Sequence, residues 1–302
     1  MKAILIASLL AAPLAGQTVT ASAVLDQPAT VSIVDASGAS SSRTMPAGTT
    51  LPAQGLLNQS GALALFSSYL QSVRTYAAVQ ISSIASAASG RSASVGPVDV
   101  LCRFTSSTPT PVRLEVEWNM SAPAGAPVPS VEVDVHNDGM VEYRGRTPGT
   151  TRLASLTLGP TPLVVRVRMQ SSSVSGYINN SVSLRVEPDS PATIAPVAGA
   201  CSPILLTANP AFDGSLDLEL YNTYANVPLP FQALAVLGLG AAPVQLPTPH
   251  PCLLIPTPDA VVPMQGELHL PTAHLQGVPI WVQAVPFSPS FTATNSFFVL
   301  YP

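Results

Sequence analysis

Lysine is almost absent from this chain, and charge of either sign is scarce. Lys2 is the only lysine, and charged residues make up 9% of the 302 residues, compared with about 25% in an average soluble protein. A nucleic-acid-binding surface needs clustered basic side chains to neutralise phosphates, and the sequence contains no basic block. The composition therefore argues against nucleic acid as a partner.

Long apolar runs are missing as well, apart from a short one at the N-terminus. No later segment reaches the roughly 18 uninterrupted apolar residues of a membrane-spanning helix, so we expect no stable membrane insertion. Met1-Lys2, an apolar run and then Pro13-Leu14-Ala15-Gly16 have the layout of a secretory signal peptide over residues 1–16. Cleavage after Ala15 or Gly16, or later at Ala21-Ser22-Ala23, would give a secreted or cell-surface chain. A buried N-terminal helix or strand is the alternative.

Catalytic signatures are absent too. There is no G-x-S-x-G nucleophile elbow, no H-E-x-x-H, no Walker lysine and no C-x-x-C. Glu115 with Glu117, and Glu132 with Asp134, place two carboxylates on one face of a strand, which glycoside hydrolysis also requires. Acids beside arginine on the wet face of a sheet are, however, ordinary surface chemistry. We expect a non-enzymatic protein without a cofactor, and a glycoside hydrolase is the less favoured alternative.

The apolar residues that are present alternate with polar ones. They make up 47% of the chain, which suits a folded core. In Val112–Trp118 every second residue, ending with Trp118, falls on the apolar face, and Val131–His136 and Leu163–Met169 alternate in the same way. This period, with turn-rich breaks, is typical of half-buried antiparallel strands. Residues 17–190 are therefore predicted to form a β-sandwich domain.

One segment, Gly61–Ser89, fits two periods. Its apolar residues from Leu63 to Ala88 recur at spacings of three and four, as in an amphipathic helix. The same segment alternates between Val73 and Ile81, and its serines, threonines and β-branched residues favour strands. We favour strands here, and a helix is the alternative.

The last third of the chain is rich in proline. Residues 201–302 hold 16 of the 32 prolines, which restricts strands to sheet edges and short lengths. After a linker at 191–200 we expect a second, Pro-rich β-sandwich. Its candidate strands are Ile204–Ala208, Ser215–Tyr221, Gln232–Leu237, Cys252–Ile255, Gly266–Leu270, Pro279–Val285 and Asn295–Tyr301. The predicted fold class is all-β, with two tandem β-sandwich domains, jelly-roll or immunoglobulin-like, after the signal peptide.

Of the three cysteines, one is predicted to be free and two are candidates for a disulfide. Cys102 lies on the same face of a predicted strand as Val100 and Phe104, so it is interpreted as a free, buried thiol. Cys201 and Cys252 lie near the ends of candidate strands in the Pro-rich domain. A bond between them would close a loop of about 51 residues and add about 4 kcal/mol of stability, if the geometry permits it.

The same third carries an ordered series of motifs. Gly199-Ala200-Cys201-Ser202-Pro203 is followed by L-D-L-E-L-Y-N, A-L-A-V-L-G-L-G, P-C-L-L-I-P-T-P-D, G-V-P-I-W-V-Q-A and T-N-S-F-F-V. Over about residues 199–302 this order resembles a recurrent module at the C-terminus of secreted bacterial proteins, whose role is uncharacterised. The resemblance implies export, a β-sandwich and a cysteine pair at these two places, and supplies no activity. The chain departs from the module at Val299-Leu300-Tyr301-Pro302, where a short aliphatic-Gly ending is usual.

One stretch matches part of a calcium-binding loop. Asp134, Asp138 and Gly139 fit positions one, five and six, but His136 and Gly145 occupy positions three and twelve, where oxygen ligands belong. A turn at Asn137-Asp138-Gly139 explains the same residues. We therefore expect no metal, with Asp134 and Asp138 as weak candidates.

The remaining candidates for ligand or metal binding are tryptophan and histidine side chains. Trp118 and Trp281 are candidate ligand-binding residues, because a flat aromatic face can stack on a sugar ring, although burial at the end of a sandwich is the commoner fate. His269 and His274 lie five residues apart and are interpreted as surface histidines rather than metal ligands.

These patterns lead to one functional expectation. The chain is predicted to be a secreted, non-catalytic structural or interaction protein of the cell surface or extracellular matrix. Its expected partner is an unidentified extracellular protein or a polysaccharide. The alternative is a carbohydrate-binding protein that uses loop aromatics and Asp or Asn side chains.

Overall fold

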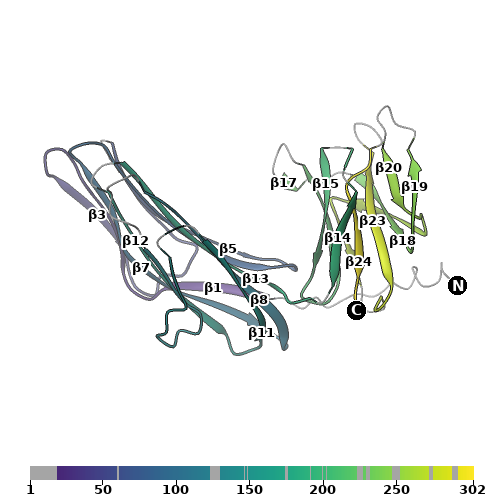
Figure 1. Cartoon of the computed structure of the whole chain (residues 1–302). Coiled ribbons are helices and arrows are strands. Elements are labelled where there is room, and N and C mark those ends of the chain that lie inside the picture. Colours follow the sequence, from purple (N-terminus) through teal and green to yellow (C-terminus); the bar gives the residue numbers. More distant parts are fainter. Residues whose placement is uncertain are drawn as a thin grey trace. The chain divides into compact units, whose positions relative to one another are not determined.

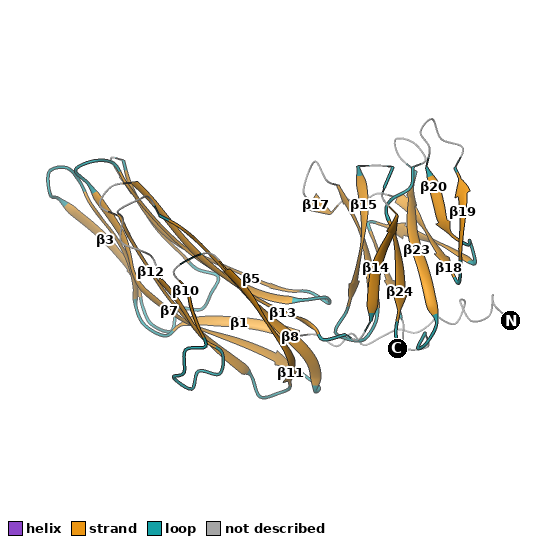
Figure 2. Cartoon of the chain, viewed as in Figure 1, coloured by secondary structure: helices purple, strands orange, loops and turns teal. Residues whose placement is uncertain are grey.

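The computed structural model describes residues 19–302 apart from residues 60, 123–129, 146, 148, 174–175, 191, 199, 202, 223–226, 229–231, 247–251, 272–274 and 288–291. The predicted signal peptide at 1–16 and His274 lie outside the described residues. Within them the chain consists of strands and loops, without a helix, as Figure 2 shows. The all-β prediction is confirmed. The chain divides into two compact units, with the boundary between Asp189 and Ser190.

The N-terminal unit is a sandwich of two antiparallel sheets (Figure 1). The strands of sheet A are β1 Val19–Leu25, β2 Ala29–Val34, β3 Ser40–Met45, β7 Ser92–Ser106, β9 Ser130–Asp134, β10 Tyr143–Gly145 and β12 Leu163–Ser173. Those of sheet B are β4 Gln54–Gln59, β5 Ala62–Ser72, β6 Ala77–Ala87, β8 Thr110–Ser121, β11 Gly149–Leu158 and β13 Gly176–Pro188. Sheet A has the order β10-β9-β12-β7-β2-β3 with β1 also on β7, and sheet B has the order β11-β8-β13-β6-β5-β4.

Alternation along these strands decides which side chains form the core. In β8, Leu114 and Val116 are fully buried, while the side chain of Glu117 on the opposite face is exposed. The ambiguous segment Gly61–Ser89 forms β5 and β6, which pair from Ala62–Ala87 to Ser72–Ala77. The strand interpretation is therefore correct, because two-sided pairing in sheet B satisfies the backbone and buries every second side chain.

The N-terminal end of β1 bears on the predicted cleavage sites. Ala21-Ser22-Ala23 lies inside β1, where Ala21 pairs with Phe104 and Ala23 with Cys102 of β7. Cleavage there would remove the first residues of a paired strand. Cleavage after Ala15 or Gly16 would leave β1 intact, although these positions lie outside the described residues.

The C-terminal unit is built from a nine-stranded sheet, sheet C, and a separate hairpin. Its strands are β14 Thr193–Ala198, β15 Ile204–Pro210, β16 Leu216–Asn222, β17 Val227–Pro228, β18 Gln232–Gly238, β19 Ala241–Gln245, β20 Leu253–Pro256, β21 Ala260–Gln265, β22 Glu267–Leu270, β23 Pro279–Pro286 and β24 Ser296–Leu300. Sheet C has the order β14-β24-β23-β18-β21-β22-β16-β15 with β17 on β16, and β19 pairs with β20. All seven strands predicted for this unit are present, with ends that differ by at most two residues.

The linker prediction needs a correction. Most of the segment 191–200 is β14, which pairs with β24 from Thr193–Leu300 to Ala198–Ser296 and forms the edge of sheet C. Pro196 and the short apolar run look like a connector in sequence, but the backbone groups of this segment find partners along β24. The second unit therefore begins about ten residues earlier than predicted.

Sheet C folds over on itself to enclose a core. β21 and β22 pair only through Gln265 and Glu267, around Gly266, whose φ of 79° is easily adopted only by glycine. Leu218 of β16 and Val282 of β23, from the two halves of the sheet, belong to one buried cluster. One bent sheet thus supplies both layers of this sandwich.

A disulfide joins Cys201, ahead of β15, to Cys252, ahead of β20. Their Cα atoms are 5.5 Å apart and 51 residues separate them in sequence. The N–H of Cys201 donates to the carbonyl of Ala293 at 3.1 Å. The disulfide expected from the sequence is present, and it fastens the start of β15 to the segment that leads into β20.

The two units differ sharply in charge. All eleven arginines lie in the N-terminal unit, together with eleven carboxylates, so that unit is electrically neutral. The segment 190–302 has five carboxylates and neither arginine nor lysine. Arginine-based ion pairs are therefore confined to the N-terminal unit.

Candidate functional site

Trp118 lies between the edge strands of the two sheets in the N-terminal unit. Its ring stacks on Tyr143 of β10, with centroids 6.3 Å apart, and its Nε1–H donates to the carbonyl of Thr147 at 2.7 Å. Gly145 and Gly149 lie against the indole, and a Cβ on Gly149 would come within 2.6 Å of Cζ2. The glycines make room for a half-buried tryptophan whose N–H group is already bonded within the protein.

Trp281 belongs to the C-terminal unit and is also half-buried. It packs edge-to-face on Phe298, its cross-strand partner in β24, with ring centroids 5.0 Å apart. Gln283, two residues further along β23, is buried, and its amide donates to the carbonyls of Leu253 and Thr294 at 3.0 and 2.7 Å. Hairpin β19–β20 therefore packs over this face of sheet C beside Trp281. The two tryptophans predicted as ligand-binding candidates stay predictions, and each makes contacts within its own unit.

The calcium-loop candidates form a turn with three converging carboxylates. Ligand oxygens of Asp134, Asp138 and Glu142 lie within 4.8 Å of one another. The Asp134 carboxylate accepts the N–H groups of Asp138 and Gly139 at 3.1 and 2.9 Å, and Glu142 accepts that of Val135 at 2.7 Å. These oxygens therefore already accept hydrogen bonds from backbone N–H groups of the loop.

The turn itself is longer than the sequence predicts. Asn137 and Gly139 have φ values of 53° and 88°, as a turn at Asn137-Asp138-Gly139 requires. The returning strand, however, starts at Tyr143, which pairs with Val133, so that the residues from Val135 to Glu142 form the connection.

One cluster of reactive side-chain types was missed in the sequence. His269 of β22 lies opposite Asp217 of β16, and its Nδ1 is 2.5 Å from the Asp217 carboxylate. Ser215 Oγ is 3.3 Å from the same Nδ1 and donates to Asp213. In a serine relay the hydroxyl and the carboxylate engage opposite ring nitrogens. Here both engage Nδ1, while Nε2 lies 3.9 Å from Asp213, so the cluster joins the β15–β16 turn to β22.

The outer face of sheet A carries the densest ionic network of the described residues. Arg166 binds Asp99 through Nε and Nη2, at 2.8 and 2.6 Å, and also binds Asp26 at 2.5 Å. Arg168 Nε is 3.2 Å from Asp99, and the Arg144–Glu132 pair is 2.8 Å. Contact with the Asp99 carboxylate raises the pKa of Arg166. Three arginines are thus bonded to three carboxylates on this face, and Asp134 lies opposite Arg166 as a fourth carboxylate.

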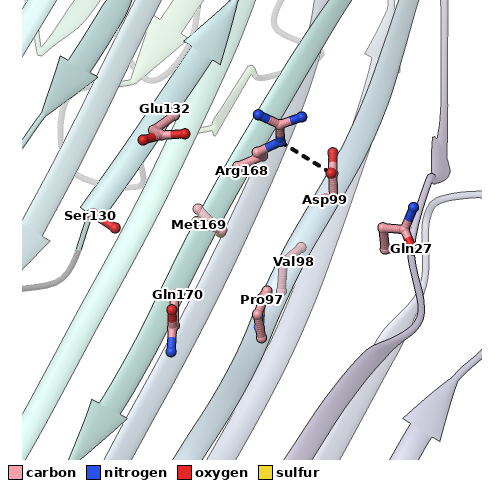
Figure 3. A pocket seen from close by; sticks show the side chains of 9 residues that line it. All are labelled: Gln27, Pro97, Val98, Asp99, Ser130, Glu132, Arg168, Met169 and Gln170. Carbon is pink, nitrogen blue, oxygen red and sulfur yellow. Dashed lines mark hydrogen bonds and ion pairs between the residues drawn. The ribbon is translucent and has the colours of Figure 1, made fainter. Parts of the chain in front are cut away.

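A groove with a volume of about 290 Å³ crosses this network. Figure 3 shows Glu132, Arg168 and Asp99 on three neighbouring strands, with the Arg168–Asp99 contact drawn. Ser130 and Gln170, each two residues from Glu132 or Arg168 on the same strand, pair across β9 and β12. Gln27 completes the polar part of the lining. The groove therefore has six polar side chains above a floor of β-sheet.

A local irregularity in β7 forms one wall of this groove. β1 pairs with residues 100–106 of β7 and β2 pairs with residues 92–95, so Gly96 to Asp99 have no strand partner on that side. The register to β12 shifts at the same place, between Met169 and Ser171. Gly96-Pro97 causes the break, because proline offers no N–H group to a ladder.

The remaining chemical group of note is the thiol of Cys102. Its side chain is fully buried in β7, and burial raises the pKa of the thiol well above its ordinary range. A thiol without a thiolate form near neutral pH is unreactive. The interpretation of Cys102 as a free, buried cysteine is confirmed.

Comparisons with known proteins give no family. No protein-family model matches the chain, and no curated protein sequence does. Among solved structures, the adhesin domain of Epf from Streptococcus pyogenes is similar at 10% identity and a TM-score of 0.22, covering 78% of this chain and 79% of that one. Such a low TM-score carries no functional argument. Among the described residues, no helix has the length and apolarity needed to span a membrane.

Proposed function

We propose that this chain is an extracellular, non-catalytic structural and interaction protein whose β-sheets present their outer faces to partners. The arrangement of its polar side chains carries the proposal. One of the two carboxylate pairs that a hydrolase could use is engaged elsewhere, Glu132 with Arg144 and Asp134 with loop N–H groups. Ser215 and Asp217 both contact Nδ1 of His269, whereas a serine relay uses opposite ring nitrogens.

The disulfide supports the extracellular part of the proposal. Disulfides persist in oxidising compartments and are rare in the cytosol. Cys201–Cys252 would stabilise the C-terminal unit by about 4 kcal/mol in the chain-entropy model, whereas Cys102 is buried where it cannot exchange with the pair. Export through the N-terminal segment agrees with this chemistry and belongs to the proposal.

Thiol counting on the full chain, recovered from the medium or cell surface of a bacterial host, tests the location. We expect no reactive thiol in the native protein, one after denaturation and three after denaturation with reduction, because only Cys102 is unpaired. Three thiols before reduction, or retention of the chain in the cytosol, would contradict the proposal.

Activity measurements test the absence of catalysis. Chromogenic ester and glycoside substrates should show no turnover above a heat-denatured sample. Turnover that disappears in Ser215→Ala, or in a Glu132→Gln variant, would overturn the non-catalytic assignment and identify the residue responsible.

A further inference from the structure

We infer that the groove on the outer face of sheet A binds a neutral saccharide, a ligand class that deepens the proposed interaction function and rests on it. The groove lies across β9, β12 and β7, away from the two edge strands of sheet A, and beside it only Gly96 to Asp99 lack a strand partner, a gap too short for an added strand. A peptide strand that adds to a sheet needs free backbone groups along an edge. Recognition in this groove must therefore come from side chains.

The groove side chains offer donors and acceptors next to each other. Gln27 and Gln170 are exposed, and their carboxamides have no hydrogen-bond partner in the described part of the chain. Arg168 uses Nε for Asp99, and its two terminal nitrogens have no partner among the described residues. Amides and guanidinium groups bind paired hydroxyls, because a hydroxyl both donates and accepts.

Charge balance selects a neutral ligand. The charged side chains that line the groove are each paired, Arg168 with Asp99, and Glu132 with Arg144, which lies outside the lining. Neither a polyanion nor a polycation would find an unpaired side chain of opposite charge in this lining, so neither gains a strong electrostatic attraction. No aromatic ring lines the groove, so binding there depends on hydrogen bonds and not on ring stacking.

The floor of the groove is held rigid from the core side. Asn180 of β13, in the opposite sheet, is fully buried, and its amide donates to the carbonyls of Ser130 and Gln170 at 3.1 and 3.4 Å. Both of these residues line the groove. A fixed floor lowers the entropy that binding must remove and so raises affinity for a small ligand.

Affinity electrophoresis of the full chain tests the inference, with gels that contain dextran, mannan, galactan or xylan, and polygalacturonate as the acidic polymer. We expect at least one neutral polymer to retard the protein, and Gln170→Ala or Gln27→Ala to weaken that binding about fivefold, the effect of one lost hydrogen bond. Gln80→Ala is the matched control, because Gln80 is an exposed glutamine on β6 in sheet B and should bind like the wild type.

Three outcomes would overturn the inference. These are retardation by polygalacturonate alone, no retardation by any polymer, and a loss in Gln80→Ala equal to that in Gln170→Ala. If the chain binds no polymer but chemical cross-linking to the cell surface captures a protein partner, the proposed function stands and the saccharide assignment fails. Thiol counts or turnover that contradict the extracellular, non-catalytic assignment would refute the proposed function separately.

Discussion

Asn295 pairs with the backbone of Leu206 as if it were a neighbouring strand. Its Oδ1 accepts the Leu206 N–H at 2.7 Å, and its Nδ2 donates to the Leu206 carbonyl at 2.9 Å. β15 is the terminal strand of sheet C, so this side chain satisfies an edge that would otherwise be open. One amide thus closes the C-terminal sandwich where no strand does.

Replacing this amide should loosen the C-terminal unit. In Asn295→Ala the N–H and carbonyl of Leu206 lose their partners, and we expect the free energy of unfolding to fall by about 1–3 kcal/mol. Denaturant unfolding followed by Trp281 fluorescence, in a Trp118→Phe background, measures it. Asn209→Ala is the control, because its amide makes only a 3.5 Å contact with Thr207. Equal stability of the two variants would refute the closing role.

Gly149 should tolerate no side chain because of Trp118. A Cβ at this position would lie 2.6 Å from the indole, so Gly149→Ala must displace the ring. We expect a loss of about 1–3 kcal/mol, typical of overpacking, and a shift of the Trp118 emission. Gly159→Ala is the control, since nothing lies within 4 Å of its Cβ. A Gly149→Ala protein with unchanged stability and emission would contradict this packing.

The carboxylate of Glu219 should make the C-terminal unit pH-sensitive. Burial, with Asp217 and Glu267 nearby, raises the pKa of Glu219. The folded state then binds this proton more tightly than the unfolded state, so stability falls as pH rises through these pKa values.

Removing the charge of Glu219 should therefore increase the stability of the C-terminal unit at neutral pH. Glu219→Gln should raise the unfolding temperature at pH 7 by a degree or two, on the order expected for a half-exposed charge. The gain should vanish below about pH 4, where the wild-type carboxyl is protonated. Calorimetry at both pH values measures it, with exposed Glu117→Gln as the control. A gain that is the same at both pH values would exclude the charge as its cause.

The Asp134 loop should be stable without calcium. Its carboxylates already accept loop N–H groups, so the unfolding temperature should be the same in excess calcium and in EDTA. Asp134→Ala should lower the stability of the N-terminal unit by about 1–3 kcal/mol in both buffers. A calcium-dependent rise in the wild type that Asp134→Ala abolishes would show that the ion binds the folded state.

Local patterns were sufficient to predict seven of the eleven strands described in the C-terminal unit. Leu114 and Val116 are buried as their alternation indicates, and the seven strands predicted after Ile204 are present, because a period of two reports burial directly. β14 was missed because its pairing with β24 joins residues a hundred positions apart in the chain, and nothing local indicates it.

Side-chain contacts also divide into those that local sequence predicts and those that depend on long-range pairing. The sequence alone determined the all-β class, the buried Cys102 and the turn at Asn137-Asp138-Gly139, because short-range backbone preferences and burial periods are local properties. Only the tertiary structure placed Ser215 and Asp217 beside His269, Asp99 beside Arg166, and Asn295 beside Leu206. Strand order and register decide which residues meet across a sheet, and they are set by the whole chain folding around its two cores.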